Sequence, residues 1–465
     1  MGGKASVLLV LGFSVVFLMM GFNFNTLTNR AVDNMSDYFL ETKAHNIAVS
    51  AANIAAARIF FDKTWEAGYT DVPFDGGTYT VFISNNFTNT TGKVVICHSP
   101  PGNPDANHTM SLPAGAVAAH LAHGDVLGVC DSTAASTTDM AVIVAEGTYE
   151  GITKTVIVEL QPSYFSKFGN FYDKMSAYPA TGDTFSGPFH VNDFLKTWGT
   201  PVFQGKTTSK KTLKMYGAPK DPKFYGGYEN GIDIPRSFDT TGYRSAAQSD
   251  GMIFKDTTGT NKLIDVEMEF NSDGTATYRS KIDGGSWSTY TTAPLTSITN
   301  NGLIYIERGN LYVKGTVNGA VSVVASKRGS SGAGNIFQTD DLIYNDDPRT
   351  NPNTRDVLGL MAEEDIRLQY NDSTKHHDIH THASMYSLNG DIGPDNALVD
   401  NDGVLASWKI LGGLIAEDTR VTAHYNSLGP YKGYKFVHTY DERLMTYVPP
   451  WFPKTENYEI VSWYE

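Results

Sequence analysis

The first part of the chain is apolar over a long uninterrupted stretch. Ala5–Phe22 carries no charged residue, none lies between Lys4 and Arg30, and the first proline is Pro73. At 1.5 Å per residue, a helix from residue 5 to 63 would be about 85–90 Å long, which exceeds the usual length of a globular helix. We predict one long helix that is apolar all round in its first third and amphipathic beyond it.

The second part of this predicted helix has a regular apolar repeat. Leu40, Ile47, Ile54 and Phe61 recur every seven residues, which is typical of a helix-packing seam. Half of the residues from 44 to 57 are alanine, and small side chains let helices approach closely. We therefore expect these four large residues to form the assembly face of the helix.

Short apolar runs separated by turn residues follow the helix. Thr78–Ser84 comes after the turn sequence Phe74–Gly77, and Ala141–Ala145 is predicted to pair with Thr148–Leu160 across the dipeptide at 146–147. A lone hairpin is only marginally stable. We therefore predict a small antiparallel sheet that rests on the distal half of the helix.

Beyond residue 164, short β runs alternate with Gly, Asn and Asp turns. An Asn or Asp residue followed by a short β run recurs at Asn310, Asp341, Asp365 and Asp418. The number of residues from each of these positions to the next fits one or two coils of a solenoid. We predict a right-handed parallel β-solenoid-like domain, and a β-sandwich is the competing architecture. The fold class is thus α+β and mostly β.

These patterns divide the chain into four parts. We predict a long N-terminal helix at 1–66, a small β headpiece at 67–163, a solenoid-like domain at 164–205 and 299–465, and an inserted β-rich subdomain at 206–298. The insertion is rich in aromatic residues, which suit carbohydrate or protein surfaces as well as the packing of a thin domain.

Composition and charge narrow the class of protein. The 465 residues carry a formal charge of −14, and no Lys/Arg cluster is present, which argues against nucleic-acid binding. Only 18% of residues are charged, and 44 glycines and 25 tyrosines give the composition of an extracellular, strand-rich protein. In an oxidising compartment Cys97 and Cys130 are candidates for a disulfide; two separate thiols are the alternative.

The N-terminal segment resembles the helix of type IV pilins and pseudopilins, in particular long PilX-like minor pilins. The resemblance rests on Ala5–Phe22, on the alanine-rich continuation and on a small sheet after it. It implies that a prepilin peptidase cuts after Gly3 and leaves Lys4 first, with Gly2 as the other candidate for the cleavage position. It also implies that the apolar half sits in the inner membrane before assembly and packs in a filament core afterwards, with copies of itself or other pilin subunits as partners.

One position departs from the family pattern. The family has a glutamate at the fifth mature residue, which pairs with a neighbour's N-terminal amine, whereas this chain has Leu8. A tip-type subunit, a divergent filament and a plain membrane anchor all stay open.

Two groups of side chains are candidates for metal binding. A histidine-rich run could hold Zn²⁺ or Cu²⁺ if it forms a strand, and an acidic loop offers oxygen ligands for Ca²⁺. Solvent-facing histidines and Asx turns explain both groups equally well. The residues are His376, Asp378, His380 and His382 for the first group, and Asp391, Asp395, Asp400 and Asp402 for the second.

The sequence favours a structural role over an enzymatic one. It contains no G-x-S-x-G, P-loop or G-x-G-x-x-G motif, and nothing in it brings carboxylates together. We expect no obligatory cofactor and a non-enzymatic, surface-exposed subunit of an extracellular type IV pilus-like filament, with its β-rich surface used for adhesion or subunit contacts. The alternatives are a membrane-anchored protein that binds a surface or carbohydrate ligand without polymerising, and an anchored β-helix carbohydrate-active enzyme.

Overall fold

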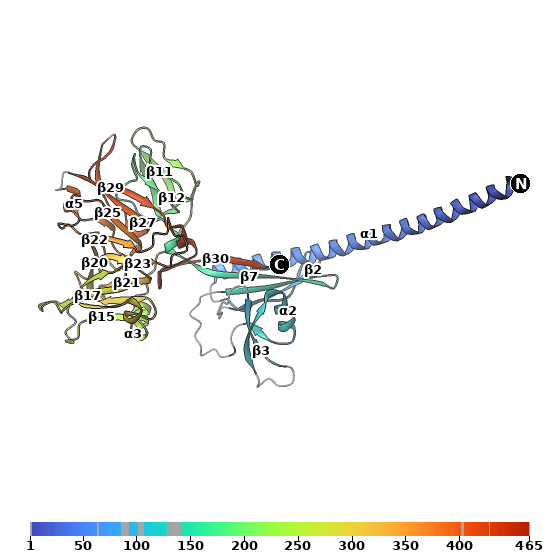
Figure 1. Cartoon of the computed structure of the whole chain (residues 1–465), viewed down its shortest axis with the longest axis horizontal. Coiled ribbons are helices and arrows are strands. Elements are labelled where there is room, and N and C mark those ends of the chain that lie inside the picture. The colour runs from blue at the N-terminus through green and yellow to red at the C-terminus, as the bar shows by residue number, and fades with distance from the viewer. Residues whose placement is uncertain are drawn as a thin grey trace. The chain divides into compact units, whose positions relative to one another are not determined.

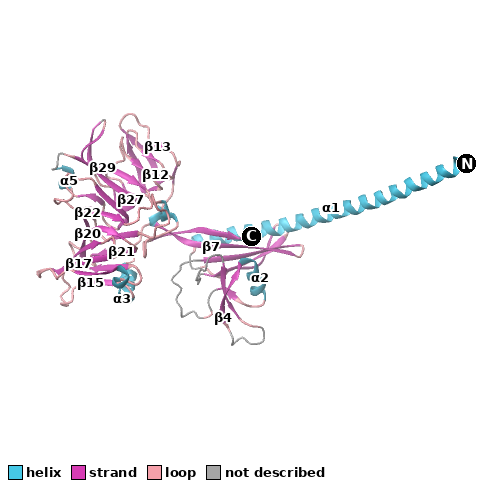
Figure 2. Ribbon diagram, in the orientation of Figure 1, coloured by secondary structure: helices cyan, strands magenta, loops and turns pink. Residues whose placement is uncertain are grey.

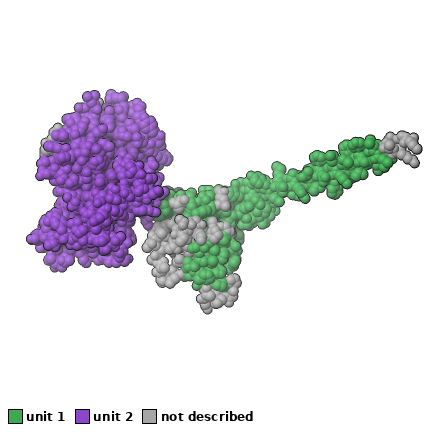
Figure 3. All heavy atoms as spheres, in the orientation of Figure 1, with its two compact units in different colours: residues 1–162, 457–465 green, residues 163–456 purple. Residues whose placement is uncertain are grey.

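The computed structural model describes residues 2–62, 65–84, 93–100, 107–127, 130, 141–400, 404–426 and 428–464. The chain forms two compact units (Figure 3). Unit 1 contains Met1–Pro162 and Asn457–Glu465, and unit 2 contains Ser163–Glu456. The chain is mostly β, with one long helix at its start, as the sequence predicts (Figure 2).

Unit 1 is built on helix α1 (Gly2–Phe61), which is 60 residues long (Figure 1). Its distal half packs on an antiparallel sheet in the order β1-β2-β6-β7-β30. The strands are β1 (Tyr69–Phe74), β2 (Gly77–Ser84), β6 (Ala141–Tyr149), β7 (Ile152–Tyr164) and β30 (Lys454–Tyr464). The sequence patterns did not indicate that the end of the chain returns to this sheet.

Two tight turns fix the register of this sheet. Asp75 and Gly76 connect β1 to β2, and Glu150 and Gly151 connect β6 to β7, all with positive φ as a two-residue hairpin turn requires. The turn predicted at residues 146–147 is therefore wrong, because the observed turn lies four residues further along the chain. Gly147 is instead a strand residue that faces α1.

The two faces of the sheet pack on different elements. Ile143 and Ala145 face α1, whereas Val142 and Val144 pack against a smaller sheet on the other side. This smaller layer contains β3 (Lys93–His98), β4 (His108–Pro113), α2 (Ala114–Ala122) and β5 (Val126–Leu127), with strand order β4-β3-β5.

Unit 2 is a parallel β-solenoid whose strands pair with the strand one coil away. The largest face has the spatial order β15-β19-β21-β23-β25-β27-β8-β10-β12-β14. Its strands are β15 (Met252–Phe254), β19 (Leu303–Glu307), β21 (Ala320–Ser326), β23 (Val357–Ala362), β25 (Ile379–Ser387), β27 (Leu405–Asp418), β8 (Asn170–Lys174), β10 (Phe189–Trp198), β12 (Thr207–Tyr216) and β14 (Tyr228–Asn230).

A second parallel face has the order β16-β20-β22-β24-β26. It consists of β16 (Ile264–Phe270), β20 (Gly309–Val317), β22 (Ile336–Tyr344), β24 (Ile366–Leu368) and β26 (Ile392–Pro394). The remaining elements are β9 (Thr184–Phe185), β11 (Val202–Phe203), β13 (Lys223–Phe224), β17 (Thr275–Ile282), β18 (Thr291–Pro294), β28 (Ala423–Asn426), β29 (Gly429–Thr439), α3 (Thr240–Ser249), α4 (Leu295–Ile298), α5 (Asn396–Asp400), η2 (Phe165–Lys167) and η3 (Glu442–Met445).

The order of the coils in space differs from their order in the sequence. The chain starts in the middle of the stack at β8 and proceeds outward to β14. It then crosses to the far end at β15 and builds back until β27 pairs with β8, Leu414 opposite Asn170. The segment 231–251 makes the crossing, and its side chains Ile234, Tyr243 and Ala247 pack on the outward-facing residues of the largest face.

A ladder of Asn and Asp side chains lines one corner of the solenoid. The Asn310 side-chain oxygen accepts hydrogen bonds from the backbone and side-chain nitrogens of Asn335. The Asn335 side chain accepts one from the backbone nitrogen of Asp365. The Asp365 side chain accepts one from the backbone nitrogen of Asp391. Asp391 in turn forms a parallel bridge with Asp418. The repeat predicted from Asn310, Asp365 and Asp418 is thus present, but Asn335 occupies the place that we assigned to Asp341.

Three of the four predicted domain boundaries differ from the structure. Residues 206–298 are not a separate insertion, because β12, β14, β15 and β16 pair within the solenoid faces. Of this stretch, β17 and β18 form an antiparallel hairpin on β16. The helix and the headpiece, predicted as two domains, form one compact unit, and the boundary with the solenoid falls after Pro162, close to its predicted place.

Candidate functional site

The N-terminal half of α1 exposes an apolar surface on all sides. Every side chain from Val7 to Phe39 is exposed, and its most apolar stretch has a mean hydropathy of 2.3 with no part buried. By length and composition this helix can cross a membrane. So much contiguous apolar surface is unfavourable in water and marks a site covered by lipid or by other protein.

The length of the uncharged part matches a bilayer. The first charged residue after Val7 is Arg30, and the intervening helix rises about 34 Å at 1.5 Å per residue. The hydrocarbon layer of a bilayer is about 30 Å thick. The exposed half of α1 is therefore long enough to span it while the docked half stays outside.

The docked half of α1 contacts the sheet through small side chains. The fully buried residues are Ala44, Ile47, Ala48, Ala51, Ala52, Ala55 and Ile59. Gly147 of β6 permits the closest approach, because a Cβ at this position would lie 2.3 Å from the carbonyl oxygen of Ala44 and 2.4 Å from the backbone nitrogen of Ala48. The alanine-rich stretch thus serves the contact between the helix and its own sheet.

The predicted seven-residue seam does not coincide with this buried face. Ile47 lies in the contact, Leu40 is half-buried at its edge, and Ile54 and Phe61 are 37% and 82% exposed. A straight helix has 3.6 residues per turn and drifts by about 20° for each heptad. A strict seven-residue repeat therefore leaves the docked face, and Ile54 and Phe61 are available for contacts outside this chain.

The residues tied to pilin processing lie at the start of α1. Leu8 is 71% exposed on the apolar half. Gly3 and Lys4 belong to the helical segment, and their side chains lie outside the described part of the structure. Cleavage after Gly3 stays a prediction.

The histidine-rich run on β25 is not brought to a common centre. Asp378 pairs with Lys409 at 2.9 Å, and His380 lies 3.4 Å from Asp341. His382 is buried and accepts a hydrogen bond from the backbone of Tyr344 at 3.1 Å. His376 lies in the preceding turn with positive φ. The proposed metal ligands in this run are thus engaged by other protein groups.

The predicted acidic Ca²⁺ loop is also divided among separate partners. Asp391 pairs with Arg367 and Arg420. Asp395 accepts from the backbone of Tyr370, and Asp400 bonds to His424 at 2.9 Å. Asp402 lies outside the described residues. Asp391, Asp395 and Asp400, the three described members of the loop, are therefore not gathered around one centre.

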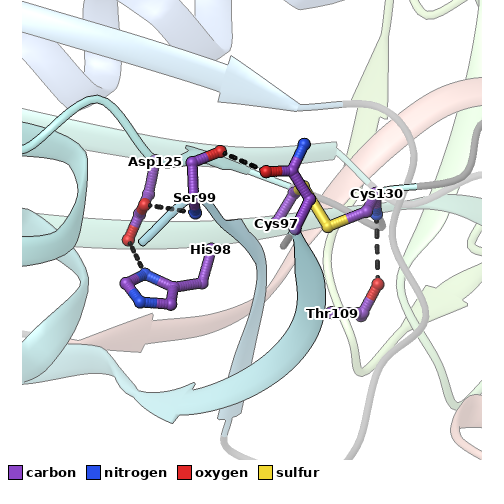
Figure 4. The surroundings of a disulfide bond; sticks show 7 residues. Cys97, His98, Ser99, Thr109, Asp125 and Cys130 are labelled. Carbon is purple, nitrogen blue, oxygen red and sulfur yellow. Dashed lines mark hydrogen bonds and ion pairs between the residues drawn. A yellow bond between two sulfur atoms is a disulfide. The ribbon is translucent and has the colours of Figure 1, made fainter. Parts of the chain in front are cut away.

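A disulfide joins Cys97 of β3 to Cys130, with the sulfur atoms 2.09 Å apart (Figure 4). The next residue after Cys97, His98, points to the carboxylate of Asp125 (Figure 4). The backbone nitrogen of Cys130 donates to the Thr109 hydroxyl at 3.1 Å, so that β4 is also connected to this point.

A cluster of histidines surrounds Asp125 in unit 1. The Nδ1 atoms of His98 and His120 each lie 2.7 Å from the same Asp125 oxygen, Oδ2. The other oxygen accepts from the backbone nitrogen of Ser99 at 2.9 Å. Within the described residues, this is the one group of three His, Cys, Asp or Glu side chains whose ligand atoms all lie within 4.8 Å of one another.

The charge of Asp125 is strongly stabilised. Its side chain is fully buried, which by itself favours the neutral acid, but the hydrogen bonds from His98, Ser99 and His120 outweigh burial and hold the pKa of the Asp125 carboxyl well below its usual range. A buried carboxylate that stays ionised beside two imidazoles presents a compact set of donors to a cation.

The sequence analysis missed this cluster because its members belong to different elements. His98 ends β3, His120 lies in the last turn of α2, and Asp125 precedes β5. The available signal was the dense spacing: four of the 12 histidines fall between residues 98 and 123.

Unit 2 has a polar and aromatic groove of about 640 Å³ over its second face. Trp287 and Tyr290 project from the hairpin region, and the Arg279 guanidinium lies 4.7 Å and 4.4 Å from their ring centroids. Carboxylates in the groove are paired with cations: Glu267 with Arg279 and Asp265 with Lys281. The groove offers hydrogen-bonding groups and exposed ring surface to a ligand.

Comparison with known proteins finds distant structural similarity. No family model matches the chain, and no curated protein matches it. Among solved structures, the chain is similar to the competence-associated pilin ComZ from Thermus thermophilus, with 11% identity and a TM-score of 0.32 over 91% of this chain and 97% of that one. Similarity at this level defines neither the fold nor the function of this chain.

Proposed function

We propose that this chain is a structural, non-enzymatic subunit of an extracellular filament of the type IV pilus kind, inserted in the inner membrane before assembly. The observation that carries the proposal is the division of α1 into two halves. One half docks on its own sheet through alanines, and the other exposes apolar side chains all round. A filament core formed by the exposed halves of many copies or of other pilin subunits would bury this surface as completely as a bilayer does.

The exposed residues beyond the membrane-length segment support assembly rather than simple anchoring. An anchor needs apolar surface over about 20 residues, yet Phe39, Ile54, Phe60 and Phe61 remain exposed further along the same helix. Other helices would cover these positions in a filament, whereas a bilayer that covers Val7–Phe24 would not reach Phe61.

Fractionation of the native cells tests this proposal. We expect the chain in the filaments sheared from the cell surface, labelled along their length or at their tips in electron micrographs, with Lys4 as the first residue by N-terminal sequencing. Removal of the prepilin peptidase should leave the chain in the membrane fraction with residues 1–3 attached.

The second candidate function is an anchored surface protein that binds a ligand without polymerising. The groove beside Trp287 and Tyr290 favours it, because aromatic rings beside polar side chains suit carbohydrate ligands. The same fractionation separates the two: a chain found with its first three residues, only in membranes and never in sheared filaments, would contradict the filament proposal and support this one.

A further inference from the structure

We propose that His98, His120 and Asp125 form a binding site for Zn²⁺ in unit 1. The three ligand atoms already converge, with both imidazole Nδ1 atoms 2.7 Å from Asp125 Oδ2. Two imidazoles and one carboxylate are a donor set that Zn²⁺ takes in proteins.

The three ligand atoms lie within 4.8 Å of one another, and a modest adjustment of the two imidazoles would let them hold the ion. Tetrahedral Zn²⁺ binds nitrogen and oxygen at about 2.0–2.1 Å, which places its ligand atoms about 3.3 Å apart. Each Nδ1 would therefore move about 0.6 Å away from Oδ2 as the ion replaces the two hydrogen-bonding protons. The imidazole side chains can supply this movement, since they are 18% and 23% exposed while the carboxylate is fully buried.

The surroundings of the three ligands also fit a bound cation. The backbone nitrogen of Ser99 holds the second oxygen of Asp125, which orients the carboxylate as an outer partner of a metal site does. His120 lies in the last turn of the nine-residue helix α2, where the helix dipole favours positive charge.

Two further histidines lie beside the three proposed ligands. The ring centroid of His108 lies 5.2 Å from that of His98, and His123 stacks on His120 at 5.5 Å. A water molecule or one of these imidazoles would complete the tetrahedron. The ion would then tie β3, α2 and the start of β5 together, beside the Cys97–Cys130 disulfide.

Zinc titration of the full chain in detergent tests the site. Bound metal is first removed with a chelator, and zinc is then added and its excess removed. We expect elemental analysis to find one Zn²⁺ per chain. At a zinc concentration 100 times the Kd, the unfolding midpoint of unit 1 should rise by about 5–10 °C. The measurement is made without reductant, because reduced Cys97 and Cys130 would offer thiolates beside the site.

Two variants and a matched control assign the binding to these residues. His98→Gln and His120→Gln should each weaken zinc binding at least about 100-fold and abolish the thermal shift, while circular dichroism and the disulfide stay unchanged. His424→Gln is the control, because His424 also pairs with an aspartate, Asp400, but belongs to no group of three such ligands within the described residues. Its zinc affinity should equal that of the original chain.

Three results would overturn the assignment. The first is a chain that binds no Zn²⁺ under these conditions, including one that binds Cu²⁺ alone. The second is zinc binding that both glutamine variants retain in full. The third is zinc binding that His424→Gln loses to the same extent as they do.

Discussion

His438 lies in the interior of unit 2 with both ring nitrogens bonded. Nε2 lies 3.0 Å from the carbonyl oxygen of Gly412, and Nδ1 lies 3.3 Å from the side-chain nitrogen of Asn170. Gly412 offers an acceptor and the Asn170 amide offers a donor, so the ring is neutral and carries its proton on Nε2. Burial lowers the pKa of His438 to about 4, and burial followed by the nearby Arg349 lowers that of His382 to about 4.

These two histidines predict that unit 2 loses stability in mild acid. An unfolded histidine binds its proton near pH 6.5, whereas these folded ones bind it near pH 4, so the unfolded state holds more protons in between. The free energy of unfolding should fall by about 3 kcal/mol for each histidine as the pH falls from about 6.5 to 4. Denaturant titrations over this range measure the slope.

The variant His438→Gln isolates one of these groups. Its amide can donate to Gly412 and accept from Asn170, so we expect it to fold and to take up about one proton fewer on unfolding near pH 5. Asp183 acts in the opposite direction, because burial raises its pKa to about 6 and favours the acid form. An unchanged acid slope in His438→Gln would show that this histidine is not buried in its neutral form.

Helix α1 shows at the scale of a single element how one sequence serves two contacts. The docked alanines lie on one face of the helix with Ile47, whereas Ile54 and Phe61, the last two residues of the seven-residue seam, lie outside this face. Ala51 is fully buried against the sheet, while Ile54, three residues later, is 37% exposed.

Aspartate substitutions on the two faces should therefore have different effects. Ala51→Asp places a charge in a closed apolar contact without a partner and should cost unit 1 about 3 kcal/mol or more. Ile54→Asp should change the stability of unit 1 by less than about 0.5 kcal/mol, as surface changes do, but reduce incorporation into filaments. Chemical denaturation measures the first effect and the recovery of sheared filaments the second. Equal losses of stability in both variants would contradict this division of faces.

The sequence predicts the helix of unit 1 better than it predicts which residues the helix contacts. The uncharged run Ala5–Phe22 and the absence of proline suffice for the helix, because both act locally. The face of the helix that would dock was not predicted correctly, because it depends on the glycine at 147, which is distant in sequence and lets the backbones approach. The same limit hid the cluster around Asp125, whose ligands meet only after β3, α2 and β5 are packed.

At the scale of the whole molecule, local patterns indicate coils but not which coils are neighbours. The corner residues Asn310 and Asp365 were recognisable because the ladder requires a side-chain acceptor on each coil. The pairing of β27 with β8 was not recognisable from the sequence, because it joins segments about 240 residues apart and any two coils expose similar edges. The choice is made by the crossing segment 231–251, which connects β14 to β15.

Arg236 is the residue of this crossing that binds both parts of the stack. Its side chain is 3% exposed. The Nε atom donates to Asp173 of β8 at 2.8 Å, and the two terminal nitrogens donate to the carbonyl oxygens of Ser387 and Leu388, at the end of β25, at 2.6 Å and 2.7 Å. A single guanidinium thus spans the junction at which the first coils of the chain meet the last.

We expect Arg236→Met to weaken this junction selectively. The change removes the guanidinium donors from two backbone carbonyl groups and from Asp173, which keeps only its hydrogen bond from Asn192. It should lower the free energy of unfolding of unit 2 by about 3 kcal/mol. Hydrogen exchange should accelerate in β8, β10 and β12, while β19 and β21 at the far end keep their protection. Arg279→Met is the matched control, because Arg279 also pairs with a carboxylate and aromatic rings but belongs to the β17 hairpin. Uniform acceleration of exchange across all coils would show that the stack unfolds as one piece and that Arg236 does not hold a separable junction.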